Sequence, residues 1–103
     1  VDEMVKEYNC RREYLLKSFK ELGIECFDAR GAFYLFPSIK KFNMTSRDFC
    51  LMLLKECNVL VVPGTAFGDS GEGFIRISYA SSKTGIEEFI NRIKKMLKSN
   101  SNN

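Results

Sequence analysis

The sequence has 103 residues, of which 45% are apolar and 28% are charged, and its formal net charge is +3. This composition is typical of one globular domain and excludes a disordered, fibrous or membrane-spanning chain. Because the chain has no histidine, it cannot form by itself a serine–histidine–aspartate triad, a cysteine–histidine pair or a Cys₂His₂ zinc site. The small charge gives no indication of nucleic acid as a partner, and we expect no metal.

The start of the chain and its cysteines indicate what kind of protein the sequence comes from. The first residues, VDEMVKEY, lack an initiator methionine and a signal peptide and lie within a predicted helix, so we expect part of a longer protein. The cysteines form no CxxC pair; they are Cys10, Cys26, Cys50 and Cys57. This spacing favours reduced, mostly buried thiols, and we expect a cytoplasmic protein.

The first half of the chain predicts a helix, an extended segment and a second helix. Apolar residues at helical spacing predict a helix over residues 1–22. Residues 24–39 are rich in aromatic side chains and predict a single extended segment that is covered on both faces. Thr45 and Asp48 resemble a capping box and predict that a helix begins there and runs over residues 46–57.

The second half predicts two strands joined by a loop. Residues 59–62, VLVV, form a short apolar strand, and residues 74–80, FIRISYA, form a second strand. The connection between them is PGTAFGDSGEG, which is rich in glycine. It matches neither glycine-rich phosphate motif and precedes a strand rather than a helix, so we exclude phosphate binding by this loop.

A last helix completes the domain. Thr84 and Glu87 repeat the capping pattern, and the helix they open is followed by a tail over residues 99–103 that we expect to be disordered. The order α-β-α-β-β-α predicts a two-layer α+β domain over residues 1–98. Its small, mostly antiparallel sheet of about three strands is packed on one face by helices.

The last strand carries an arginine in its middle. Alternation in a strand places Ile75, Ile77 and Tyr79 on one face and Phe74, Arg76, Ser78 and Ala80 on the other. The isoleucine face must meet the helices, so Arg76 projects from the face that they leave uncovered. A solvated arginine and an anion receptor both fit this placement.

Three segments together resemble a known family. They are GAFYLFP, VLVVPGTAFGDSGEGFIRISYA and EEFINRIKKML, and they follow a helix with the paired arginines Arg11 and Arg12. In this order and spacing they resemble the C-terminal small domain of class I/II, fold-type I, pyridoxal-phosphate-dependent aminotransferases. The motifs are most similar to the aspartate-aminotransferase-like enzymes.

The resemblance implies roles for five residues. Arg76 stands where the family's arginine binds the α-carboxylate of the amino-acid substrate. Phe33 stands at the aromatic position near the substrate. Gly31, Gly64 and Phe67 are expected to form the rim of the site.

The resemblance also implies what this chain does not supply. In the family, pyridoxal 5'-phosphate and its Schiff-base lysine belong to the large domain, and none of Lys83, Lys94 and Lys95 stands in a matching motif. We therefore expect no catalytic or cofactor-binding residue here and no activity of this chain alone. The intact enzyme is expected to be a homodimer that transaminates an amino acid with a 2-oxo acid.

Other functions share parts of this pattern. A related pyridoxal-phosphate lyase or synthase would keep the same small domain and arginine, and a non-catalytic amino-acid-binding module would use Arg76 without chemistry. An RNA-binding domain is disfavoured, because the strand begins with Glu72 where such domains need a basic residue, and it presents Arg76 and Ser78 where they need aromatic rings.

Overall fold

The structure is a computed structural model that describes residues 2–29, 33–57 and 59–101. In these residues it has three α-helices and four β-strands. They are α1 (Asp2–Glu21), β1 (Cys26–Ala29), β2 (Tyr34–Pro37), α2 (Ser46–Glu56), β3 (Val61–Pro63), β4 (Ile75–Ser78) and α3 (Lys83–Ser101). The α+β class predicted from the sequence is confirmed.

The strands form one antiparallel sheet in the order β1-β2-β4-β3, so β2 and β4 are central. Leu35 pairs with Ile77, and Val62 pairs with Arg76. Partners that lie directly opposite each other project from the same face of a sheet. This register therefore places Leu35 and Ile77 on one face and Val62 and Arg76 on the other.

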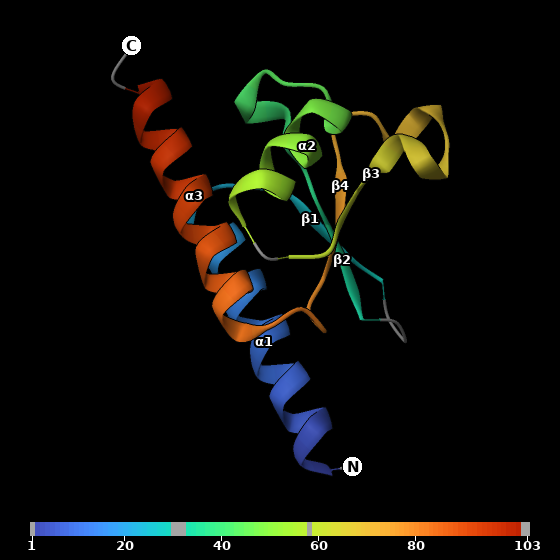
Figure 1. The fold of residues 1–103 in the computed structure, drawn as a ribbon, viewed down its shortest axis with the longest axis vertical. Coiled ribbons are helices and arrows are strands. Elements are labelled where there is room, and N and C mark those ends of the chain that lie inside the picture. Colours follow the sequence, from blue (N-terminus) through green and yellow to red (C-terminus); the bar gives the residue numbers. More distant parts are fainter. Residues whose placement is uncertain (1, 30–32, 58, 102–103) are drawn as a thin grey trace.

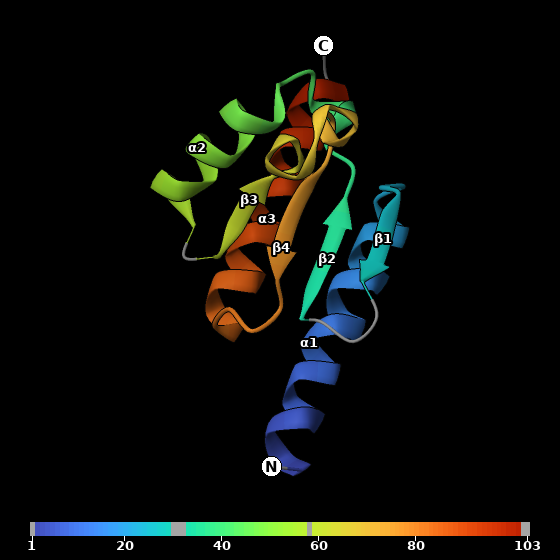
Figure 2. The same ribbon diagram turned by 90° about the vertical axis from the view of Figure 1, so that its right-hand side faces the viewer.

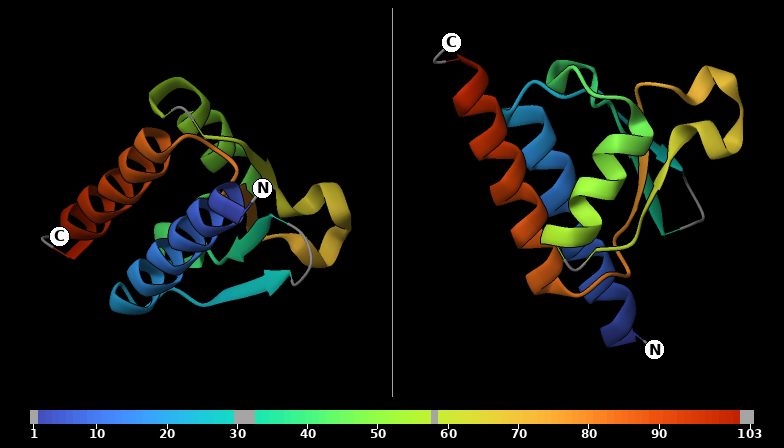
Figure 3. Two further views of the ribbon diagram at one scale, coloured as in Figure 1. Left: turned by 90° about the horizontal axis from the view of Figure 1, so that it is seen from below. Right: turned by 45° about the horizontal axis from the view of Figure 1, so that its top comes forward.

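Helices α1 and α3 lie side by side against one face of the sheet, as Figure 1 and the end-on view in Figure 3 show. Helix α2 lies beside the edge strand β3. Figure 2 looks onto the opposite face, where none of α1, α2 and α3 stands in front of the sheet and the short 3-10 turns Gly64–Phe67 and Asp69–Gly71 lie at one end. The predicted packing of helices on one face is confirmed.

The core lies between the sheet and the helices α1 and α3. Leu35, Ile75 and Ile77 are fully buried on the sheet side. Phe19 of α1 and Phe89 of α3 meet them from the helix layer, with ring centroids 6.1 Å apart in an edge-to-face arrangement. Complete burial of a side chain of this size contributes about 1.5–3 kcal/mol.

The prediction of a single extended segment over residues 24–39 is wrong. This segment holds both β1 and β2, which pair in an antiparallel hairpin with Ala29 opposite Tyr34. The sheet therefore has four strands in the described residues rather than about three. Length was the missed signal, because strands rarely exceed about ten residues.

Helix α3 differs from its predicted bounds at both ends. It begins at Lys83, and the Ser82 hydroxyl accepts a hydrogen bond from the Gly85 amide at 3.0 Å, so Ser82 takes the capping role expected of Thr84. The helix continues to Ser101, whereas a disordered tail was expected from residue 99. The helical hydrogen bonds extend through these polar residues without an intervening glycine or proline. By contrast, Thr45 caps α2 as predicted, because its hydroxyl accepts from the Asp48 amide.

The cysteines are free thiols with different exposures. Cys50 and Cys57 are buried, Cys26 is partly buried and Cys10 is exposed, so two of the four thiols are buried where most were expected to be. Burial raises the pKa of Cys26 to about 12 and that of Cys50 to about 11. Among the described residues, no helix is long and apolar enough to cross a membrane, and no three acidic or cysteine side chains gather as metal ligands.

Two glycines close the loop between β3 and β4. A Cβ atom on Gly64 would lie 2.1 Å from the carbonyl oxygen of Gly71, and a Cβ atom on Gly71 would lie 2.1 Å from that of Gly64. The Gly64 amide donates to the Phe74 carbonyl at 2.8 Å, and the Phe74 amide donates to Gly71 at 3.1 Å. The two ends of the loop are thus in backbone contact, which only glycine permits.

We expect Gly64→Ala to lower the free energy of unfolding of the chain by about 1–3 kcal/mol, the range for an overpacked interior. The added methyl group meets backbone oxygen, which cannot move aside as a flexible side chain would. Urea unfolding followed by circular dichroism measures the change. The control is Thr65→Ala in the same turn, where the side chain is exposed. Equal stability of the two variants would contradict the prediction.

Candidate functional site

The face that the helices leave uncovered is rich in aromatic side chains. Phe27 pairs with Phe36 across β1 and β2, and Tyr34 precedes Phe36 by two residues on β2. We call this surface the open face; its residues are Phe27, Tyr34, Phe36, Val62, Phe74 and Arg76. The Phe27 residue is 56% exposed to solvent. Such a surface is suited to be covered by other protein.

Arg76 lies in the middle of β4, at the centre of the open face. Its neighbours in the chain, Ile75 and Ile77, are fully buried beneath the helices, so the backbone at Arg76 is held in place from the opposite side. Its own side chain is partly exposed. A rigid strand in the centre of a sheet aims a side chain better than a loop does.

Two aromatic rings support the guanidinium of Arg76. Its central carbon lies 4.1 Å from the centre of the Tyr34 ring and 4.9 Å from that of Phe67. Within the described residues, its N–H groups have no hydrogen-bond or ion-pair partner. Stacking uses the faces of the guanidinium and leaves its edge free, and that edge matches the two oxygens of a carboxylate.

A pocket of about 270 Å³ lies on the open face beside these rings. It is lined by Phe27, Phe36, Gly64, Phe67, Ser70, Gly71 and Phe74. The Phe67 ring borders both this pocket and the guanidinium, and it meets Phe36 at 6.1 Å between centroids. An apolar wall lowers the local dielectric constant and so strengthens the attraction between an arginine and a bound anion.

The structure brings together some of the residues expected at the site. Phe67 contacts Arg76, and Gly64 opens the turn that carries Phe67. Phe33 lies elsewhere, because its ring packs against Tyr8 of α1 at 5.0 Å and against Tyr79 at 5.8 Å. Gly31 is outside the described residues.

Tyr34 is the neighbour of Arg76 that sequence reasoning missed. It follows Phe33 directly, and alternation sends the two side chains to opposite sides. The signal that would have found it is the pairing of β2 with β4, which sets Tyr34 opposite Ser78 and two residues from Arg76. That pairing joins residues more than forty positions apart in the chain.

A carboxylate anchors the start of β4. The Oε2 atom of Glu72 accepts hydrogen bonds from the backbone amide of Ser46 at 2.9 Å, from its hydroxyl at 3.1 Å and from the amide of Gly73 at 2.9 Å. Ser46 is the first residue of α2. These hydrogen bonds, with that of the Ser46 amide first, lower the pKa of Glu72. The start of β4 is thus tied to the positive end of α2.

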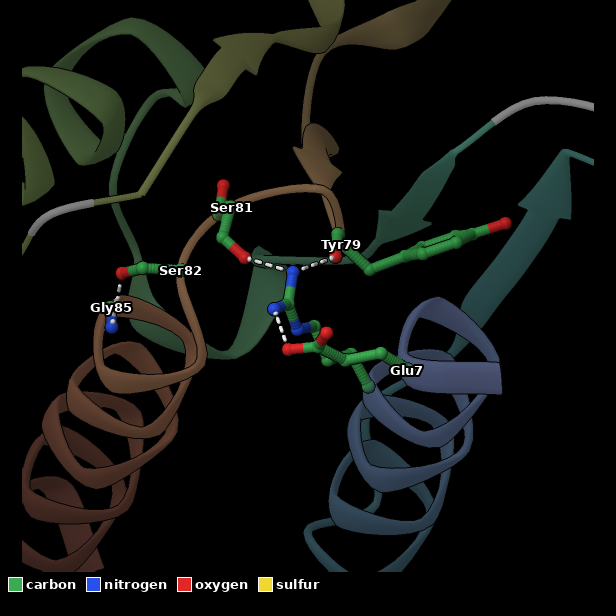
Figure 4. A network of polar contacts seen from close by, with 6 residues as sticks. Glu7, Tyr79, Ser81, Ser82 and Gly85 are labelled. Atoms are coloured by element: carbon green, nitrogen blue, oxygen red, sulfur yellow. Dashed lines mark hydrogen bonds and ion pairs between the residues drawn. The ribbon is translucent and has the colours of Figure 1, made fainter. Parts of the chain in front are cut away.

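An arginine of α1 anchors the other end of β4. Arg11 Nη1 donates to the carbonyl oxygen of Ser81 at 2.9 Å and to that of Tyr79 at 3.5 Å, and Nη2 pairs with Glu7. Figure 4 shows these contacts as dashed lines that run from one guanidinium to the carboxylate of Glu7 and to the backbone carbonyls of Tyr79 and Ser81. Arg12, the next residue, pairs instead with Asp28 of β1.

Together these features define a domain that presents one supported arginine on an otherwise apolar sheet face. The family model for aminotransferase class I and II matches residues 1–93. The chain therefore belongs to the class I and II aminotransferase family.

Relatives with known names agree with this family. Aspartate aminotransferase of Pyrococcus abyssi is 46% identical over 95% of this chain and 25% of its own length. Aromatic-amino-acid aminotransferase 2 of Thermococcus litoralis is 45% identical over the same shares of the two chains. The crystal structure of an aromatic aminotransferase from Pyrococcus horikoshii superposes with a TM-score of 0.79 and 44% identity, over 97% of this chain and 27% of that one. This chain thus spans about a quarter of the length of these relatives.

We expect the hydrogen bonds of Glu72 to make the stability of the domain fall in acid. Because folding lowers its pKa below the ordinary value of 4.5, the ionised group stabilises the fold above that pH, and this contribution is lost as pH falls through the folded pKa. Urea unfolding at pH 7 and at several pH values below 4.5 measures how steeply the free energy of unfolding falls with pH. Glu72→Gln should flatten it, with Glu21→Gln on α1 as the control for net charge. An unchanged slope in Glu72→Gln would contradict the prediction.

Proposed function

We propose that this chain is the substrate-carboxylate-binding small domain of a pyridoxal-phosphate-dependent amino-acid aminotransferase. The observation that carries the proposal is the guanidinium of Arg76, which lies over the Tyr34 ring and has no hydrogen-bond or ion-pair partner among the described residues. A planar pair of donors on a rigid strand fits the α-carboxylate that amino acids and 2-oxo acids have in common. Membership of the aminotransferase family supports the same substrates.

The residues described here do not fit the cofactor itself. The ends of the loop between β3 and β4 are closed on each other at Gly64 and Gly71, which leaves no open backbone cradle for a phosphate. Lys83, Lys94 and Lys95 belong to α3, on the far side of the sheet from Arg76. We therefore assign pyridoxal 5'-phosphate, its Schiff-base lysine and the proton transfers to a large domain elsewhere in a longer chain, and this part alone should be inactive.

The contribution of this chain to the reaction is binding and orientation. Arg76 donates edge-on to the substrate carboxylate and fixes the position of the adjacent Cα atom. The rings of Phe36 and Phe67 exclude water from this ion pair and so strengthen it. Holding a reacting carbon in one orientation is worth several orders of magnitude in rate when the catalytic groups are equally fixed.

The open face also indicates what covers it. Its aromatic residues suit packing against the large domain of the same chain, which would place Arg76 at the boundary between the two. We further propose a homodimer in the cytoplasm, in keeping with free thiols. The donor is an amino acid, and motif similarity favours an enzyme like aspartate aminotransferase. A related lyase or synthase is the alternative, and it would break a carbon–sulfur bond or form a cyclopropane ring in place of transferring the amino group.

We expect Arg76→Ala in the full-length enzyme to cost about 2–5 kcal/mol of transition-state stabilisation, the range for loss of a desolvated charge pair. This corresponds to a fall in kcat/KM of roughly thirty- to several-thousand-fold. The measurement is an amino-donor panel followed by the cofactor's absorbance, with 2-oxo acid product identified.

The matched control is Arg92→Ala. Arg92 is an arginine of α3 that pairs with Glu56 at 2.8 Å, away from the open face. Its kcat/KM should stay within about twofold of the parent value, as for a surface pair of small energetic weight. A loss below threefold in Arg76→Ala would overturn the proposed role of Arg76.

A further inference from the structure

We propose that Arg11 is a positioning residue for the carboxylate site, and that it acts by holding the end of β4 that follows Arg76. The inference rests on the proposed function of Arg76. Arg11 belongs to α1, on the opposite side of the sheet from the open face, and it touches none of the residues of that face.

The side chain of Arg11 is built into the structure. Only 15% of the side chain is exposed to solvent. The guanidinium donates to the backbone carbonyls of Ser81 and Tyr79, pairs with Glu7 one helical turn earlier, and lies over the ring of Tyr8 at 5.4 Å. A cation held by two carbonyls, a carboxylate and a ring has one preferred position, and the backbone it binds shares that position.

The backbone that Arg11 holds connects directly to the arginine site. Tyr79 lies three residues after Arg76, which corresponds to about 10 Å of extended strand. The Tyr79 amide donates to the carbonyl of Phe33, immediately before β2, at 3.0 Å. The hydroxyl of Ser81 accepts from the amide of Leu60, immediately before β3, at 3.0 Å. Arg11 therefore fixes the turn at which β4 is joined to both of its neighbours.

Those neighbours supply the surroundings of the guanidinium. Strand β2 carries Tyr34, on which Arg76 stacks, and β3 carries Val62, its cross-strand partner. Loss of the Arg11 contacts would let the ends of these strands shift against one another. A shift of about 1 Å between a binding group and its ligand costs on the order of a hundredfold in rate. If the strand ends only loosen and keep most of their order, we expect a smaller loss, of about tenfold.

Arg12 provides a matched control. It is the next residue on α1, carries the same charge, and also joins the helix to the sheet through a side chain, because its Nε donates to Asp28 at 3.0 Å. Its partner lies on β1, an edge strand that is hydrogen-bonded to β2 and not to β4. Arg12→Gln thus removes a helix-to-sheet ion pair of the same kind but leaves the end of β4 held.

The experiment uses the full-length enzyme and two readouts. The first is KM and kcat for an amino acid, and the second is the dissociation constant of succinate, a dicarboxylate that is not turned over, measured by calorimetry. We expect Arg11→Gln to lower kcat/KM about tenfold and to raise the succinate dissociation constant about tenfold. Arg12→Gln should change either constant less than twofold.

The same substitution is then made in the Arg76→Ala background. If Arg11 acts through Arg76, Arg11→Gln causes no further loss there. An equal loss in both backgrounds, or equal effects of Arg11→Gln and Arg12→Gln, would overturn the inference. Failure of the proposed function would look different, because Arg76→Ala alone would then leave succinate binding and KM unchanged.

A second variant serves if Arg11→Gln does not fold. Glu7→Gln keeps Arg11 and its two carbonyl contacts but weakens the ion pair that orients it. It should raise the succinate dissociation constant about threefold with Arg76 present and leave it unchanged in Arg76→Ala. An unchanged dissociation constant with Arg76 present would overturn the inference.

Discussion

The burial of Ile75 and Ile77 under α1 and α3 is the constraint on which the rest of the molecule depends. Each of these side chains contributes about 1.5–3 kcal/mol when it leaves water. A slip of β4 by one residue would expose both of them and drive the Arg76 charge into the core. The position of the arginine is therefore determined by its neighbours in the chain rather than by its own contacts. Within the described residues the guanidinium makes no hydrogen bond or ion pair, which is the basis of the role proposed for it.

The open face combines a fixed cation with a surface that excludes water. Tyr34 and Phe67 support the guanidinium by their ring faces and take none of its hydrogen bonds. A ligand carboxylate would find donors already oriented, so little ordering of the protein is needed on binding. An arginine without an ion-pair partner binds an anion more strongly than an arginine whose existing salt bridge must break before the anion can bind.

The sequence predicted the features that depend on local pattern. Alternation placed Arg76 on the uncovered face, and the spacing of Thr45 and Asp48 located the start of α2. The hairpin of β1 and β2 was missed although the length of residues 24–39 exceeds that of an ordinary strand. Tyr34 was missed for a different reason, since its contact with Arg76 follows from the register of β2 against β4, which is not contained in either segment alone. Local periodicity identifies the face of a strand, whereas neighbours across the sheet are decided by long-range packing.

The contact between Gly64 and Gly71 makes the chain enter and leave residues 65–70 at a single point. The backbone hydrogen bond from Gly64 to Phe74 and the close approach of Gly64 to Gly71 set the spacing of β3 and β4 at this end of the sheet, so residues 65–70 form a loop with fixed ends. Phe67, one of the two rings beside the Arg76 guanidinium, belongs to this loop. Tyr34, the other ring, belongs to strand β2 of the sheet. Under the proposed function, one wall of the carboxylate site therefore lies on the sheet and the other on a loop, and a loop tolerates substitution better than the strands that it connects.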